Sequence, residues 1–205
     1  MDPTEWVVPG ARVLEVGSGD GTLARRLARQ GAVTVALDLA GEALRRVTGD
    51  SDGPQLRSTG RLWGLQGRAE CIPLRAGAFD LVLVQTSLMH IDLEPFAFEA
   101  RRLLRPGGRL VLVEPMPYHP LVALYRALWS AGRGSGARYP SRRDLSRLLQ
   151  GFTSIRISRH GFLSPFGAWF GARAVVWIVR WDRWLLARVP ALRRLAWFSY
   201  VVAER

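Results

Sequence analysis

The sequence contains no lysine, one cysteine and no long uninterrupted hydrophobic run. The lone Cys71 excludes a disulfide within the chain and a multi-cysteine zinc site, which favours a reducing compartment. No apolar run approaches the roughly 20 residues that a membrane-spanning helix needs. The first residues also lack the basic and then apolar pattern of a secretory signal peptide. We therefore expect a cytoplasmic protein.

What the chain has in excess is arginine and tryptophan, and both are concentrated in its second half. Residues 1–115 carry fourteen arginines and fourteen acidic residues, so this half is neutral. Residues 116–205 carry fifteen arginines and three acidic residues, which accounts for the whole net charge of +12, and six of the eight tryptophans. Because every basic position is arginine, genomic base composition explains the choice and no single arginine carries an argument. The grouped charge indicates an anionic partner or a solvated face.

Strand and helix patterns alternate in the first half. Short apolar runs predict strands at residues 12–16, 33–37, 62–65, 79–84 and 109–113. Amphipathic segments between them predict helices at residues 21–30, 41–47 and 96–104, with Pro106-Gly107-Gly108 ending the last one. Such alternation is typical of a doubly wound parallel sheet with helices on both faces.

Three glycines at every second position follow the first predicted strand. Gly17, Gly19 and Gly21 lie where a helix begins, so a ligand can approach both the bare main chain and the free N–H groups of the helix. A dinucleotide fingerprint would need its third glycine at Thr22, which disfavours a nicotinamide oxidoreductase. No G-K-[ST] follows, which excludes a phosphate-binding P-loop.

An acidic residue ends the second predicted strand. Asp38 follows Gly17 by 21 residues, where a carboxylate can accept hydrogen bonds from ribose hydroxyls. The three glycines and Asp38 together predict a cofactor that contains a nucleoside.

Four segments then follow one another, and they are "VLEVGSGDG", "VALD", "GRAECIPLRAGAFDLVLVQTSLMHI" and "EARRLLRPGGRLVLVEP". In order and spacing, from Val13 to Pro115, they resemble the motifs of class I S-adenosylmethionine-dependent methyltransferases, in the branch with ubiquinone, menaquinone and many small-molecule enzymes. The resemblance implies an α/β, Rossmann-like, doubly wound seven-stranded sheet, mostly parallel with an antiparallel last strand. It also implies a helical insertion before that last strand.

The resemblance divides the chain by role. We expect residues 1–205 to form a single domain, with residues 1–115 as its cofactor-binding half and residues 116–205 as its acceptor-side half. A Trp- and Arg-rich helical insertion would occupy about residues 165–196.

The resemblance also assigns residues to S-adenosylmethionine. It implies cofactor contacts from Glu15, Gly17, Gly19, Gly21, Asp38, Leu39, Ala69, Glu70 and Gln85. The glycine segment would wrap the methionine part, Asp38 would hold the ribose, residues 69–71 would flank the adenine, and Gln85 would line the sulfonium side. Arg68 departs from the family, which often has an acid at that position.

Two histidines are candidates for catalysis. His90 matches a histidine often present in the family, and His119 follows the strand at residues 109–113. Either could contact the acceptor or act as a base, and either could instead be a packing residue. We predict no metal site.

The expected function is methyl transfer to oxygen or carbon of a small, apolar or lipid-like acceptor. The alternative is a catalytically inactive protein of the same fold that uses its basic half to hold a membrane or partner. An RNA methyltransferase is disfavoured because the arginines are mixed with bulky apolar residues. The Trp/Arg segment could be a helix packed on the core, or a cap that also rests on an anionic membrane, which would give a peripheral position at the inner membrane surface.

Overall fold

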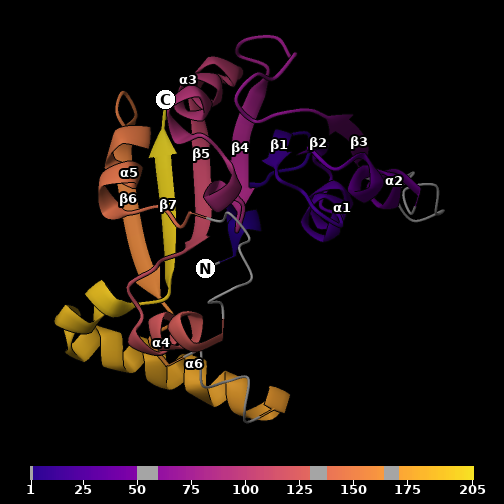
Figure 1. Ribbon diagram of the computed structural model, residues 1–205. Coiled ribbons are helices and arrows are strands. Elements are labelled where there is room, and N and C mark those ends of the chain that lie inside the picture. The colour runs from indigo at the N-terminus through magenta and orange to yellow at the C-terminus, as the bar shows by residue number, and fades with distance from the viewer. Residues whose placement is uncertain (1, 50–59, 130–137, 164–170) are drawn as a thin grey trace.

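A seven-stranded mixed sheet forms the centre of the computed structural model, which describes residues 2–49, 60–129, 138–163 and 171–205 (Figure 1). The strand order is β3-β2-β1-β4-β5-β7-β6. The strands are β1 Arg12–Val16, β2 Val33–Asp38, β3 Arg61–Gln66, β4 Phe79–Gln85, β5 Leu104–Pro115, β6 Thr153–His160 and β7 Phe198–Glu204.

The direction of the strands confirms the predicted fold class. Strands β3, β2, β1, β4 and β5 pair in parallel, whereas β7 is antiparallel to both β5 and β6. The order reverses at β1, whose neighbours are β2 and β4. In such sheets the carboxyl ends of the strands beside this reversal form the ligand site.

Helices pack on both faces of the sheet and at its carboxyl edge. The described helices are η1 Pro3–Trp6, α1 Thr22–Arg29, α2 Gly41–Gly49, η3 Leu88–His90, α3 Leu93–Leu103, α4 Pro120–Trp129, α5 Arg142–Leu148, α6 Gly171–Arg188 and η5 Pro190–Leu195. Side chains of α3 and α5 pack in the same buried cluster as Leu14. Its neighbour Val13 lies in a second cluster with Leu27 of α1, because successive strand residues point to opposite faces.

Among the predicted strands and helices of the first half, the start of β5 differs most from its prediction. Helix α3 ends at Leu103, and β5 begins at once and includes Pro106-Gly107-Gly108. The N–H of Gly107 donates to the carbonyl of Arg205, and the N–H of Arg205 donates to the carbonyl of Gly108. This pairing with the last residue of the chain draws the turn-like segment into the sheet, and it cannot be deduced from local sequence.

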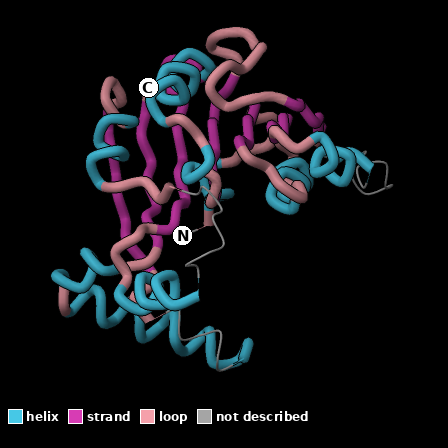
Figure 2. The backbone as a smooth tube through the Cα atoms, viewed as in Figure 1, coloured by secondary structure: helices cyan, strands magenta, loops and turns pink. Residues whose placement is uncertain are grey.

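Helices α4 and α6 gather beyond the end of β5 (Figures 1 and 2). Strand β5 ends at Pro115, opposite Phe198 at the start of β7, and Phe198 in turn pairs with His160 at the end of β6. The segment between His160 and Phe198 therefore begins and ends at the carboxyl edge of the sheet. The expected helical insertion is present there as α6 and η5, although residues 164–170 lie outside the described part. In the described part of the chain, no helix is long and apolar enough to cross a membrane.

Candidate active site

The glycines of the loop between β1 and α1 have different surroundings. Gly17, Gly19 and Gly21 have φ angles of 72°, 53° and 76°, which disfavour any residue with a Cβ. A Cβ on Gly17 would come within 2.3 Å of the Ser87 Oγ, and one on Gly21 within 2.4 Å of the Val47 Cγ2. A Cβ on Gly19 would meet nothing within 4 Å. Gly17 and Gly21 are thus packed against protein, whereas the main chain at Gly19 is open.

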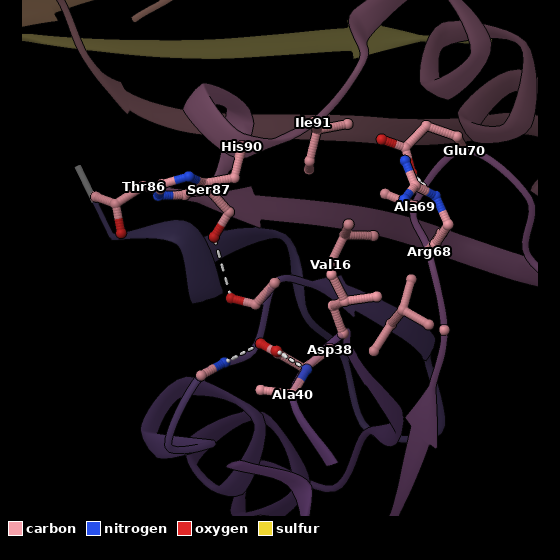
Figure 3. Close-up of a pocket in the computed structure, with 15 residues that line it drawn as sticks. Val16, Asp38, Ala40, Arg68, Ala69, Glu70, Thr86, Ser87, His90 and Ile91 are labelled. Atoms are coloured by element: carbon pink, nitrogen blue, oxygen red, sulfur yellow. Dashed lines mark hydrogen bonds and ion pairs between the residues drawn. The ribbon is translucent and has the colours of Figure 1, made fainter. Parts of the chain in front are cut away.

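A cavity of about 790 Å³ adjoins this loop. Figure 3 shows Thr86, Ser87 and His90 on one side of it, residues 68–70 on another, and Asp38 below. The lining also includes Val16, Gly17, Gly19, Leu37, Leu39, Ala40, Gly67 and Ile91. The cavity thus lies at the carboxyl ends of β1, β2 and β4, where the strand order reverses.

Asp38 connects the loop to the cavity wall. Its Oδ2 accepts a hydrogen bond from the Gly19 N–H at 2.8 Å, and its Oδ1 accepts one from the Ala40 N–H at 2.9 Å (Figure 3). A carboxylate oxygen can accept more than one hydrogen bond, so both oxygens retain capacity for a ligand hydroxyl. The site therefore fits a ribose.

A second cavity of about 390 Å³ lies on the other side of the loop. It is lined by Glu15 and Gln85 and shares Gly17, Gly19 and Thr86 with the larger cavity. All the predicted cofactor residues line one cavity or the other except Gly21, which packs against Val47. Their individual roles stay predictions.

Glu15 is a buried acid beneath the loop. Burial raises the pKa of its carboxyl group from 4.5 to about 8, with a smaller contribution in the same direction from Asp20 and Asp38. A backbone hydrogen bond at Ala24 acts in the opposite direction, and the Oε2 atom has no hydrogen-bond partner. The carboxyl group is thus available to a polar or cationic ligand part in the smaller cavity.

The sequence patterns missed Glu114, which organises the opposite wall. Its Oε1 accepts hydrogen bonds from the N–H groups of Ser87 at 3.0 Å and Leu88 at 3.2 Å. The Ser87 Oγ donates to the Gly17 carbonyl at 3.1 Å, so these contacts join β5, the segment after β4 and the glycine loop. Burial raises the pKa of Glu114 to about 7. The available signal was an acid inside the apolar run "RLVLVEP".

Thr86 shows backbone strain at the same place. Its φ angle is 55°, which is unusual for a β-branched residue. Such strain persists only where surrounding contacts hold it, and it clusters at functional sites.

Arg68, the departure from the family pattern, is partly neutralised. Its Nε lies 3.4 Å from the Glu70 Oε2, and the Glu70 Oε1 accepts a hydrogen bond from the Asp92 N–H at 3.0 Å. The guanidinium is mostly exposed, so the pair adds little stability, but it places an acid beside Arg68 at the cavity wall.

The two candidate histidines lie in different environments. His90 is exposed on η3 and lines the larger cavity. His119 is buried, and its Nε2 lies 2.8 Å from the carbonyl oxygen of Phe162. Because a carbonyl only accepts, this nitrogen must carry the proton. His119 lines neither cavity, so its catalytic role stays a prediction without support from its position.

No cluster of three or more His, Cys, Asp or Glu side chains that could hold a metal ion occurs among the described residues.

The fold and this site define a class. A sheet of order 3-2-1-4-5-7-6 with β7 antiparallel, an open glycine loop after β1 and an acid at the end of β2 is the arrangement of class I S-adenosylmethionine-dependent methyltransferases. In agreement, residues 14–112 match the family described as "Methyltransferase domain". Through this segment the chain is similar to the class I S-adenosylmethionine-dependent methyltransferases, as its motifs indicated, and S-adenosylmethionine is the cofactor of that class.

Similar proteins agree with this assignment. An uncharacterized methyltransferase of Mycobacterium tuberculosis is 40% identical over 111 residues, which cover 53% of this chain and 42% of that protein. A ubiquinone biosynthesis O-methyltransferase of Xylella fastidiosa is 37% identical over 105 residues, which cover 49% of this chain and 40% of that protein. The matches thus span less than half the length of these relatives.

A similar solved structure extends the likeness of fold to the whole chain. A methyltransferase from Methanosarcina mazei superposes with a TM-score of 0.69 at 17% identity, covering 100% of this chain and 98% of that one.

Proposed function

We propose that the protein transfers a methyl group from S-adenosylmethionine to oxygen or carbon of a small, apolar or lipid-like acceptor. The observation that carries the proposal is the pair of cavities that share the open main chain at Gly19. When bound, the cofactor supplies a methyl group on a positively charged sulfur. Transfer of that group needs alignment and exclusion of water more than it needs an acid or base.

The two cavities suggest how this chain would hold the cofactor. Asp38 would accept hydrogen bonds from the ribose hydroxyls, and Leu39, Ala69 and Glu70 would flank the adenine in the larger cavity. Glu15 and Gln85 would face the methionine part in the smaller cavity.

The larger cavity, which would hold the ribose and adenine, offers one candidate contact for the acceptor at its wall. His90 is exposed there, beside Thr86 and Ser87. We propose that His90 contacts the acceptor or removes its proton when the acceptor must lose one. The ubiquinone biosynthesis O-methyltransferase of Xylella fastidiosa supports oxygen as the methylated atom. A phosphoethanolamine N-methyltransferase of Haemonchus contortus, with a TM-score of 0.68 at 16% identity, shares the fold, so the fold alone does not choose the atom.

We further propose that residues 1–205 act as a single domain, with the cofactor held by residues 1–115 and the acceptor approached by residues 116–205. One buried cluster contains residues of both parts, such as Leu14, Leu148 and Val201, which supports a single domain. As location we propose the cytoplasm with peripheral contact at the inner membrane surface. Exposed tryptophan and arginine on α6 support that contact.

The cofactor assignment is tested by calorimetric titration with S-adenosylmethionine, its demethylated product and NAD. We expect binding of the first two and none of NAD. Asp38→Ala should weaken binding by about 1.5–3 kcal/mol, or about 10- to 150-fold, the scale for losing hydrogen bonds to a charged group. Glu42→Ala removes an exposed carboxylate on α2 and is the matched control. Equal affinity in the Asp38 and Glu42 variants would contradict the role of Asp38.

Turnover separates an enzyme from an inactive binding protein of the same fold. Labelled S-adenosylmethionine is incubated with the protein and with extracted lipids and quinones, and methyl incorporation is measured. Incorporation that disappears in the Asp38→Ala variant supports the enzyme. Cofactor binding without incorporation into any extract favours the inactive alternative.

A further inference from the structure

Helix α6 presents a row of exposed tryptophans. Trp177, Trp181 and Trp184 are spaced i, i+4 and i+7, so they share one side of the helix. Their exposed fractions are 61%, 55% and 49%. Large aromatic side chains usually lose most of their exposure on folding, and three together on one helix indicate a surface that meets something else.

The opposite side of α6 holds the helix on the protein. Asp182 and Leu186, each 4% exposed, lie about half a turn away from the tryptophan row. The Asp182 carboxylate accepts hydrogen bonds from the backbone N–H groups of Gly161 at 2.9 Å and Leu163 at 2.6 Å. The helix therefore has a fixed rotation, with its polar anchor inward and its tryptophans outward.

The outward side is also positively charged. Arg180, Arg183 and Arg188 are exposed, and the guanidinium groups of Arg180 and Arg188 lie 5.2 Å and 5.3 Å from the ring centres of Trp177 and Trp184. Asp182 is the only acidic residue of α6, and it is buried. The exposed face thus combines aromatic rings with arginines and carries no negative charge of its own helix.

This combination fits an anionic lipid bilayer. Tryptophan favours the boundary between headgroups and acyl chains, and arginines beside it reach lipid phosphates. A second copy of the chain would bring the same positive charge, since residues 116–205 carry the whole net charge of +12. Nucleic acid would match the charge, but phosphates do not explain why three tryptophans and Val176 are exposed together on this helix.

We propose that α6 docks on an anionic membrane surface through Trp177, Trp181 and Trp184, with Arg180, Arg183 and Arg188 contacting the headgroups. The inference rests on the proposed function, whose peripheral contact it assigns to one helix face. Helix α6 lies at the carboxyl edge of the sheet, the edge that also holds the cofactor cavity. Docking by this face therefore brings that edge of the protein toward the bilayer, where a lipid-like acceptor resides.

Co-sedimentation with vesicles tests the proposal. The full chain is mixed with vesicles of phosphatidylcholine alone, or of phosphatidylcholine and phosphatidylglycerol in equal amounts, at low and high salt. We expect binding to the anionic vesicles at low salt, less at high salt, and little to the neutral vesicles. Failure of the wild type to bind anionic vesicles at low salt would overturn the proposal, as would tight, salt-sensitive binding of RNA in place of vesicles.

Two triple variants and matched controls assign the contact to α6. Substituting Arg180, Arg183 and Arg188 with Gln should lower the partition coefficient by on the order of 100-fold, because each basic side chain near the surface contributes about fivefold. Substituting the three tryptophans with Ser should lower it by roughly tenfold or more, including at high salt. The controls replace exposed residues of the other half, namely Arg29, Arg45 and Arg75 with Gln, and Trp63 with Ser. Equal losses in α6 variants and controls would overturn the assignment.

Circular dichroism and S-adenosylmethionine affinity are measured for every variant. Unchanged cofactor affinity with lost vesicle binding supports the docking face. Vesicle binding without any S-adenosylmethionine binding in the wild type would instead contradict the proposed function and leave the docking face supported, so the two failures are distinguishable.

Discussion

Replacing Glu15 with glutamine tests whether a buried carboxyl group beneath the glycine loop makes folding depend on pH. Glu15 is 4% exposed, and burial raises its pKa from 4.5 to about 8. Glutamine has nearly the same shape but does not titrate. The variant therefore removes the proton equilibrium while it keeps the side chain volume.

The direction follows from which state holds the proton. Between pH 4.5 and about 8 the unfolded chain has released the proton of Glu15, whereas the folded protein retains it. The favourable contribution is present in full below pH 4.5 and is lost as the pH rises through about 8. The interval from 4.5 to about 8 corresponds to a free energy of roughly 5 kcal/mol.

Urea denaturation at about pH 5 and about pH 9 measures this term, since these values lie near the two ends of the interval. We expect the unfolding free energy of the wild type, relative to Glu15→Gln, to fall by several kcal/mol between them. Glu114 also has a raised pKa, of about 7, but it is present in both proteins and cancels in the difference. Unfolding free energies that change in parallel with pH would refute the argument that Glu15 is protonated in the folded protein.

Two further substitutions test the contacts around the site. Gly17→Ala should cost about 1–3 kcal/mol of stability and also weaken cofactor binding, because its Cβ would lie 2.3 Å from the Ser87 Oγ. Gly77→Ala is its control in urea denaturation and cofactor titration, since Gly77 has a φ of 67° but open space around it; equal costs would mean that the clash is absent. Asp182→Ala should destabilise the protein by about 2–4 kcal/mol in urea denaturation, because two backbone N–H groups lose their acceptor. A change below about 0.5 kcal/mol would show that Asp182 does not anchor α6.

Much of the parallel sheet could be predicted from local sequence, because buried strands are short apolar runs and each ends at a recognisable turn. Residues 12–16 form a strand as expected, and so do residues 79–84 within a strand one residue longer. The prediction was wrong at the end of α3. Pro106-Gly107-Gly108 has the composition of a helix stop, but its hydrogen bonds go to Arg205, about a hundred residues away. Local propensity contains no information about such a partner.

The two walls of the site also differ in how far the sequence could predict them. The sequence revealed Gly17, Gly19 and Asp38. A nucleoside cofactor needs a main chain without side chains and a carboxylate, and both are recognisable as residue types at the ends of predicted strands. Glu114 was missed because an acid within an apolar run does not reveal which groups it contacts. Its role became visible only when the sheet placed it behind the Ser87 and Leu88 N–H groups.

Helix α6 shows why periodicity alone left its environment open. A tryptophan row at i, i+4 and i+7 is equally compatible with packing on the core and with exposure. In the first case the apolar side of the helix contacts the protein core, and in the second it is free to contact another molecule. The decisive residue is Asp182. A buried carboxylate must find donors, and Asp182 finds them in the backbone N–H groups of Gly161 and Leu163, which follow β6. Once Asp182 turns toward them, Trp177 and Trp184 must point away from the protein, and the arginines beside them make that outward face positive.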